Sequence, residues 1–137
     1  MNTKRLVTGT VVGGVILYVL GYLIFDRMFA DFYAANVGSA TGAEREPQLV
    51  WAVMLGSLSY AALVTLAVGS GGGSSDMVRG VKAGAVVGFL LWFTTDFILY
   101  GVSNLSNLTR TAVDPLLELV RSAIAGGVIA VVLGKIR

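Results

Sequence analysis

Four long apolar stretches constrain this chain more than any other feature of its sequence. They cover about residues 6–28, 47–68, 77–103 and 115–134, and a helix needs about 20 consecutive apolar residues to cross a bilayer. Only 13% of the 137 residues are charged, whereas soluble domains carry about 25%. A soluble core of this size could not bury so much apolar surface. The sequence therefore predicts an all-α membrane protein, a single domain over residues 1–137 whose four transmembrane helices form a bundle in a lipid bilayer.

The composition also excludes several kinds of chemistry. The chain contains neither cysteine nor histidine, which excludes disulfides, thiol nucleophiles, zinc sites of the usual kind, His-ligated haem and a histidine base. The net charge of +2 comes without a basic cluster, so no nucleic-acid partner is expected. Because no nucleophile–base pair is recognisable either, we expect a protein that is not an enzyme and holds no cofactor or metal.

Proline and acidic residues indicate where the second and fourth helices begin. Pro47 follows Glu46, and Pro115 follows Asp114. Proline is favoured at the first helical position, and acidic side chains suit the positive end of the helix dipole. We therefore expect Pro47 and Pro115 to open these helices, with Asp114 as an N-cap. The Gly/Ser run 69–75 is predicted to be a flexible connector.

The first helix is predicted to continue past the membrane edge. Apolar side chains follow its transmembrane stretch at helical spacing. They are Phe25, Met28, Phe29, Phe32 and Tyr33. Such a stripe could pack on neighbouring helices or lie among lipid headgroups.

The two halves of the chain look related. When Gly14 is placed over Gly84, Asp26 falls over Asp96 without a gap, and the two prolines fall close together. Each half would be a helical hairpin, and a duplication would give parallel repeats about an axis along the membrane normal. Coincidence between two low-complexity apolar segments remains the alternative.

Small residues recur at three- and four-residue spacing and predict close helix packing, because they let two backbones approach where no hydrophobic effect drives association. The predicted packing residues are Gly80, Gly84, Gly88, Gly126, Gly127 and Gly134. We expect these contacts within one chain. Assembly into a homo-oligomer, or into a larger membrane complex, stays open.

Charged residues lie near the helix ends opposite to the termini. Asp26 ends the first stretch, and Asp96 lies about one turn before the end of the third. Glu118 and Arg121 lie inside the fourth. A charge at the bilayer centre costs about 2.5–3.5 kcal/mol on insertion scales, so such residues are candidates for a functional site. Arg121 could pair with Glu118 three residues earlier on its own helix, or reach across to Asp96.

Two interpretations of these residues remain open. One is a polar pocket with Tyr22, Trp92 and Tyr100 as its walls. Its predicted polar members are Asp26, Thr94, Thr95, Asp96, Asn104, Asn107, Glu118 and Arg121. The other is a cluster of salt bridges that only fastens the bundle.

The distribution of basic residues predicts the orientation in the membrane. Six of them lie at the termini or beside the Gly/Ser run. They are Lys4, Arg5, Arg79, Lys82, Lys135 and Arg137. By the positive-inside rule, both termini are cytoplasmic in a multi-pass protein of the bacterial inner membrane. The polar pocket would then face the outside.

Several short motifs carry a resemblance that covers the whole chain. They are Gly21-Tyr22 and Phe25-Asp26 at the end of the first span, Arg45-Glu46-Pro47, KAGAVVGF at 82–89, TDFILYGVSN at 95–104, Ala125-Gly126-Gly127 and Leu133-Gly134-Lys135. In these the chain resembles small bacterial four-helix integral membrane proteins of unknown function. The resemblance implies a four-span bundle and no established activity. Small multidrug-resistance transporters share the four spans, but the glutamate of their first span is missing here.

From these features we expect a bundle that binds or transports a small solute or ion through an acidic outer pocket. The ligand itself is not indicated by the sequence. An accessory or scaffold subunit of a larger membrane complex, with a purely structural charged cluster, is the alternative.

Overall fold

The structure, a computed structural model, describes residues 1–71 and 76–136. Its helices are α1 (Thr3–Gly21), the π-helix η1 (Tyr22–Met28), α2 (Ala30–Ala35), α3 (Val50–Gly69), α4 (Met77–Val102) and α5 (Leu108–Lys135). Part of the predicted Gly/Ser connector (residues 72–75) and the basic residue Arg137 lie outside the described residues.

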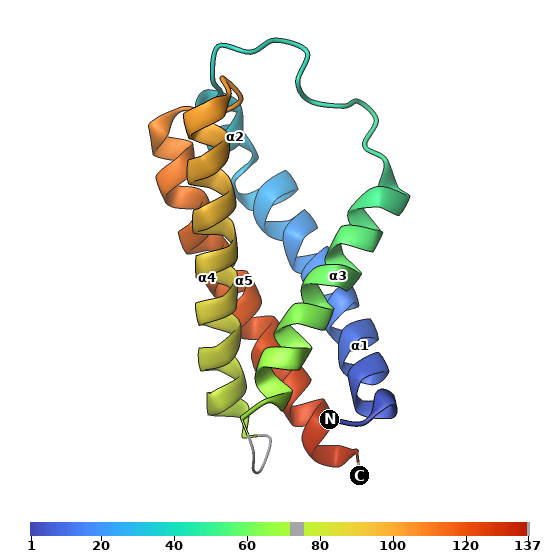
Figure 1. Ribbon diagram of the computed structural model, residues 1–137. Helices are drawn as coiled ribbons and strands as arrows, with labels where there is room; N and C mark the ends of the chain where they lie inside the picture. Colours follow the sequence, from blue (N-terminus) through green and yellow to red (C-terminus); the bar gives the residue numbers. More distant parts are fainter. Residues whose placement is uncertain (72–75, 137) are drawn as a thin grey trace.

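The all-α prediction is confirmed. In the described part of the chain, four helices are long and apolar enough to cross a membrane: Thr3–Met28, which joins α1 and η1, and then α3, α4 and α5. They pack against one another (Figure 1). By the length and composition of its helices, this is a multi-pass membrane protein.

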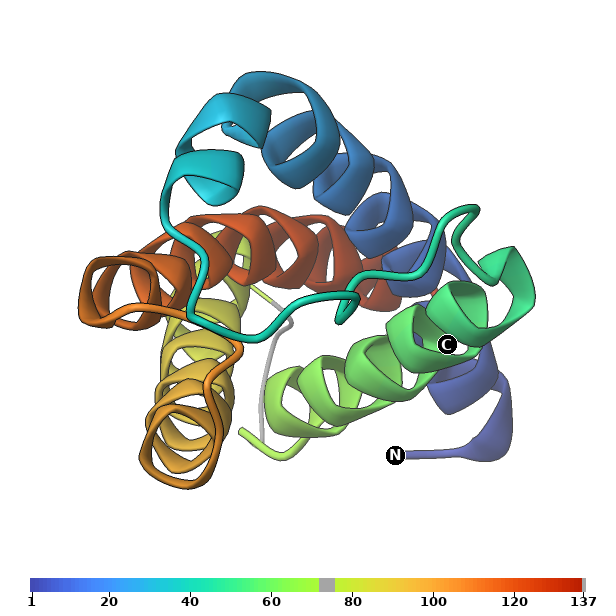
Figure 2. The same cartoon turned by 90° about the horizontal axis from the view of Figure 1, so that it is seen from above.

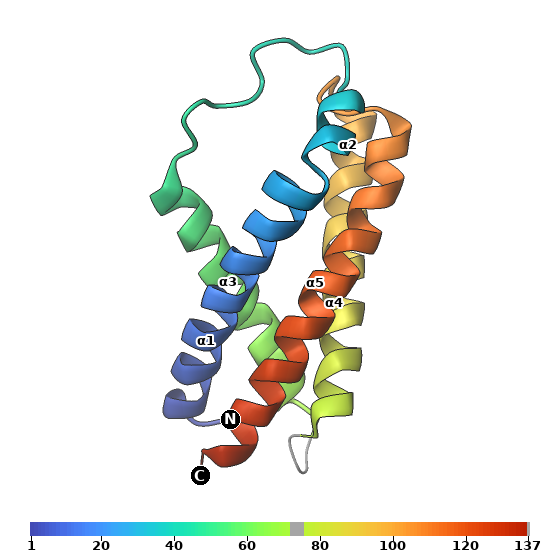
Figure 3. The ribbon, with the colours of Figure 1, turned by 180° about the vertical axis from the view of Figure 1, so that it is seen from behind.

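The four long helices form two hairpins, α1 with α3 and α4 with α5, whose connections lie at the same end of the bundle. The start of α1, the end of α3, the start of α4 and the end of α5 lie at one end, called here the terminal end (Figures 1 and 3). The connections from α2 to α3 and from α4 to α5 lie at the other, the loop end. Helices α4 and α5 run side by side, whereas α3 leans away from α4 towards the loop end (Figure 2). A duplication of the hairpins stays a prediction.

Glycines bring the backbones of α4 and α5 into direct contact. Gly80, Gly84 and Gly88 are buried. A Cβ atom on Gly84 would overlap the carbonyl oxygen of Ser122 and lie 3.1 Å from the Cα atom of Gly126. Only glycine leaves room for this approach.

The other two predicted packing glycines differ from each other. A Cβ atom on Gly127 would lie 2.9 Å from Cγ2 of Val81 on α4, so Gly127 also lies at a close contact. Gly134 is exposed near the end of α5. The prediction is wrong for Gly134, because the last turn of α5 extends beyond the tight contact with α4.

The apolar core lies mainly towards the terminal end, between α1, α3 and α5. Leu17, Val64, Ile129 and Leu133 are fully buried there. Few apolar side chains join this core at the loop end, so the bundle is tightly packed at one end and open at the other.

Two predicted helix starts are wrong. Helix α5 begins at Leu108 with Asn107 as its N-cap, whose Oδ1 atom accepts a hydrogen bond of 2.9 Å from the amide of Arg110. Pro115 lies inside this helix and is buried, because the asparagine cap starts the helix two turns earlier and packing against its neighbours carries it past the proline. Helix α3 begins only at Val50, since the backbone of Leu49 is still extended.

The continuation of the first helix was predicted, but not its geometry. At Tyr22 the chain changes to π-helical hydrogen bonding, and at Phe29 the backbone leaves the helical region (φ −114°, ψ 16°) before α2 begins. Within the predicted stripe, Met28 is 72% exposed. Phe25, Phe29, Phe32 and Tyr33 are half-buried.

Replacing Gly84 with alanine should disrupt the fold, because the new Cβ atom forces α4 and α5 apart. We expect a loss of about 1–3 kcal/mol in the free energy of unfolding, the usual cost of overpacking. Gly101→Ala on the same helix is the matched control, since a Cβ atom there meets no atom within 4 Å. Unfolding of both variants in mixed detergent micelles measures the difference. Equal stability would contradict the close contact.

Candidate functional site

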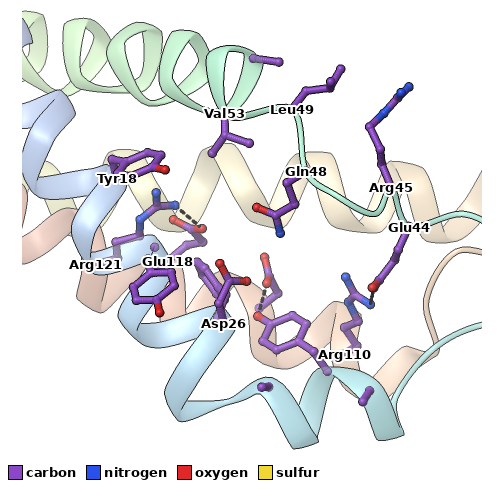
Figure 4. Close-up of a pocket in the computed structure, with 18 of the residues that line it drawn as sticks. Tyr18, Asp26, Glu44, Arg45, Gln48, Leu49, Val53, Arg110, Glu118 and Arg121 are labelled. Atoms are coloured by element: carbon purple, nitrogen blue, oxygen red, sulfur yellow. Dashed lines mark hydrogen bonds and ion pairs between the residues drawn. The ribbon is translucent and has the colours of Figure 1, made fainter.

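A cavity of about 1200 Å³ opens between the helices at the loop end. Helices α1, α2 and α5, the π-helix η1, the first turn of α3, residues 44–49 and Trp92 of α4 line it (Figure 4). Eight charged residues line it: Asp26, Glu44, Arg45, Glu46, Arg110, Asp114, Glu118 and Arg121. Five of these are acidic and three are basic, so the lining has an excess of negative charge.

Arg121 lies at the floor of this cavity and ties α5 to α1. Its Nε and Nη2 atoms donate hydrogen bonds of 2.9 and 2.5 Å to the carbonyl oxygen of Leu17. Its Nη1 atom donates to Oε1 of Glu118 at 2.9 Å. The sequence left open whether Arg121 pairs with Glu118 or with Asp96. In the described structure it pairs with Glu118 and forms no ion pair with Asp96.

A glycine makes the insertion of Arg121 possible. A Cβ atom on Gly21 would lie 2.6 Å from Nη2 of Arg121, so a larger residue there would displace the guanidinium. The same guanidinium lies 5.5 Å from the ring centroid of Phe25 and 5.8 Å from that of Tyr60. Both distances are within the range of a cation–π interaction.

Glu118 is the most deeply buried acid of the site, with 2% of its surface exposed. Its Oε1 atom accepts from Arg121, but its Oε2 atom is buried without a hydrogen-bond partner among the described residues. The hydroxyl of Tyr60 is near, yet it forms no hydrogen bond of ordinary geometry either. An unsatisfied buried carboxylate oxygen is costly.

A second polar contact fixes α2 to the start of α5. The Tyr33 hydroxyl donates a hydrogen bond to Asp114, and the guanidinium of Arg110 lies 4.8 Å from the Tyr33 ring centroid. Burial, and then the contact with Asp114, raise the pKa of Tyr33. Tyr33 therefore remains a hydrogen-bond donor at neutral pH.

Sequence reasoning missed this second contact. Tyr33 belonged to an apolar stripe, and Asp114 was assigned to a helix cap. The only available signal was a hydroxyl-bearing side chain near the end of that stripe, and it does not indicate a partner 81 residues away.

Some predicted pocket residues do line the cavity. Asp26, Glu118 and Arg121 are among them, together with the predicted aromatic walls Tyr22 and Trp92. Figure 4 shows Asp26 between the pair formed by Glu118 and Arg121 and the Arg110 side of the cavity. The structure therefore brings together the predicted residues of α1–η1 and α5.

The remaining predicted residues lie elsewhere, so the prediction of one continuous pocket is wrong. Thr94 and Tyr100 are exposed, because the rotation of α4 turns them away from the bundle. Thr95 faces a separate groove, and its hydroxyl donates to the carbonyl oxygen of Leu91 at 2.8 Å. Asn104 is exposed in the α4–α5 connection, and Asn107 caps α5.

Asp96 also lies outside the cavity lining. It is half-buried beside Asp114 of α5, and its Oδ2 atom is buried without a partner in the described residues. Asp96 therefore belongs to the contact between α4 and α5 behind the cavity wall.

No protein-family model, curated protein or solved structure matches this chain. The resemblance to small bacterial four-helix membrane proteins accordingly stays a prediction. The chemistry of the cavity has to be inferred from its own residues.

Replacing Arg121 with glutamine should destabilise the bundle, because Glu118 is left as an uncompensated buried charge. Breaking one side of a buried ion pair costs about 3–5 kcal/mol. The double variant Glu118→Gln/Arg121→Gln should recover part of this loss. A double-mutant cycle on detergent unfolding measures the coupling, with Arg27→Gln at an exposed position of η1 as the control. Strictly additive effects would refute the pairing.

Proposed function

We propose that this protein binds a small organic cation in the loop-end cavity. The observation that carries the proposal is the position of Asp26. Its side chain lines the cavity and forms no hydrogen bond or ion pair with the part of the chain that the structure describes. A carboxylate without a counter-ion at the wall of a partly enclosed cavity favours a positively charged ligand.

The other charges around the cavity do not neutralise Asp26. Arg121 is already paired with Glu118 at 2.9 Å, and Arg110 lies 3.9 Å from Glu44. Arg45 also lines the cavity, without an ion pair among the described residues, so the lining sets three arginines against five acidic residues. Negative charge therefore remains in excess where a ligand would lie.

Aromatic side chains form much of the remaining wall. Tyr18, Tyr22, Phe25 and Trp92 line the cavity. Aromatic faces attract ammonium groups, and a carboxylate with aromatic walls suits an amine or a quaternary ammonium. The volume of about 1200 Å³ is above the range of about 300–1,000 Å³ usual for small-molecule pockets. It leaves room for a solute together with water.

The proposal includes transport of this cation and assigns no catalytic role to the cavity. Its described lining offers carboxylates, arginines and phenols without a nucleophile held beside a base. Binding and release are therefore the chemistry that these groups support best.

We also propose that the protein lies in the bacterial inner membrane with both termini in the cytoplasm and the cavity open to the outside. Support comes from Lys4, Arg79, Lys82 and Lys135, all at the terminal end of the bundle. Trp51, in the first turn of α3 and 67% exposed, lies where aromatic side chains meet the headgroup layer.

A second candidate function is that of an accessory or scaffold subunit in a larger membrane complex. The observation in its favour is the contact of Arg121 with Glu118 and Leu17, which fastens α5 to α1 without any ligand. Native mass spectrometry after purification separates the candidates, because a subunit would copurify with a protein partner.

Asp26→Asn should weaken binding of tetramethylammonium at least about tenfold, or about 1.4 kcal/mol, by removing the carboxylate that faces the ligand. Isothermal titration calorimetry on protein in lipid nanodiscs measures this change. Asp31→Asn is the matched control, since Asp31 is an exposed acid of α2 outside the cavity. Absence of binding to the unaltered protein, or equal losses in both variants, would reject the proposal.

The proposed orientation is tested by C-terminal fusions. A reporter that fluoresces only in the cytoplasm should be active when fused after residue 137, because the positive-inside rule keeps that end in the cytoplasm. Alkaline phosphatase fused at the same position should be inactive. The reverse pattern would place the cavity on the cytoplasmic side.

A further inference from the structure

On the basis of the function proposed above, we propose that the ligand is a cationic amphiphile. Its ammonium group occupies the loop-end cavity, and its hydrocarbon chain lies in a lateral groove between α3 and α4. This groove, of about 670 Å³, is separate from the predicted polar pocket. Four observations support this ligand class.

The first observation is the nature of the groove. Val53 and Leu63 of α3 face Leu91 of α4 across it. The hydroxyl of Thr95, the polar group from α4 in this lining, is bonded to the carbonyl oxygen of Leu91 on its own helix. Ser57, Ser59 and Tyr60 of α3 and Arg121 of α5 add polar atoms to the lining, but most of its exposed surface is apolar. The groove therefore suits a hydrocarbon chain better than a polar solute.

The second observation is that the groove adjoins the cavity. Val53, Trp92 and Arg121 line both of them. A single molecule can therefore place one part in the acidic cavity and another part in the apolar groove. Trp92 lies at the junction between the two parts.

The third observation is the depth of the groove and its opening to lipid. It follows α3 from Val53 to Leu63, or about 15 Å at 1.5 Å per residue. This part of α3 is inside a candidate membrane span. Val53 is 44% exposed and Leu63 is 42% exposed. The groove thus opens sideways at the depth of lipid chains, where α3 leans away from α4 (Figure 1).

The fourth observation concerns the charge of the ligand. A hydrocarbon chain gains little by moving from lipid into an equally apolar groove, so the headgroup has to provide the selectivity. Asp26 and the acidic excess of the cavity favour a cationic headgroup and oppose an anionic one. A fatty acid would place its carboxylate among carboxylates.

The test uses the fluorescence of Trp92 in the full chain in lipid nanodiscs. The chain has two tryptophans, so Trp51→Phe leaves Trp92 as the reporter. The probe is an alkyltrimethylammonium with bromine on its hydrocarbon chain, because bromine quenches tryptophan at contact. We expect saturable quenching that excess tetramethylammonium reverses by displacing the headgroup.

Two variants fill the groove without touching the cavity. Gly56 lines the groove, and a Cβ atom there meets no atom within 4 Å, so Gly56→Leu should fold and occupy the space of the chain. Ser59→Leu, at an exposed groove position, is the second blocking variant. Gly101→Leu is the matched control, because its Cβ atom also meets open space but lies outside the groove.

Both blocking variants should lower the affinity for the brominated probe at least about tenfold, with tetramethylammonium binding and the Gly101→Leu control unchanged. Saturable quenching that survives both variants would overturn the inference. The inference would also be overturned if the protein binds tetramethylammonium by calorimetry but shows no saturable quenching. In that case the proposed function would still stand. If neither compound binds, the proposed function fails and this inference fails with it.

Discussion

The backbones of α4 and α5 approach each other more closely than any side chain larger than hydrogen would permit at Gly80, Gly84 and Gly126. Between helices in lipid there is no hydrophobic driving force, so van der Waals contact over such a surface is the main source of association. This contact makes α4 and α5 one rigid wall. Helices α1 and α3 pack against that wall, and the cavity forms where they diverge from it.

The absence of water from the lipid interior also explains the contacts of Arg121. Inside lipid a guanidinium needs protein partners, and Arg121 finds them in Glu118 and the carbonyl oxygen of Leu17. These bonds close the floor of the cavity and hold α1 at the turn before it changes to π-helical geometry. The tight helix pair and this one side chain thus set the shape of the acidic space at the loop end.

The sequence was sufficient to predict the four long helices, but not all of their starts, and only part of the site. Apolar length predicted the helices, and the i, i+3 spacing allowed the pairing of Glu118 with Arg121, because both signals are local. The contact of Tyr33 with Asp114, and the position of Asp96 outside the cavity, depend on the rotation of helices distant in sequence. Periodicity places residues on a helix face but does not show which helix that face meets. The lining contributed by residues 44–49 has no helical period from which it could be predicted.

The bond between Leu17 and Arg121 joins residues 104 positions apart, in α1 and α5. A ribosome makes the chain from its N-terminus, so α1 is in the membrane long before its arginine partner exists. Because Glu118 precedes Arg121 on the same helix, α5 can enter lipid with its positive charge already neutralised. Helix α5 is made after α1 and therefore brings both the donor that bonds to Leu17 and the counter-ion that lets this donor enter lipid.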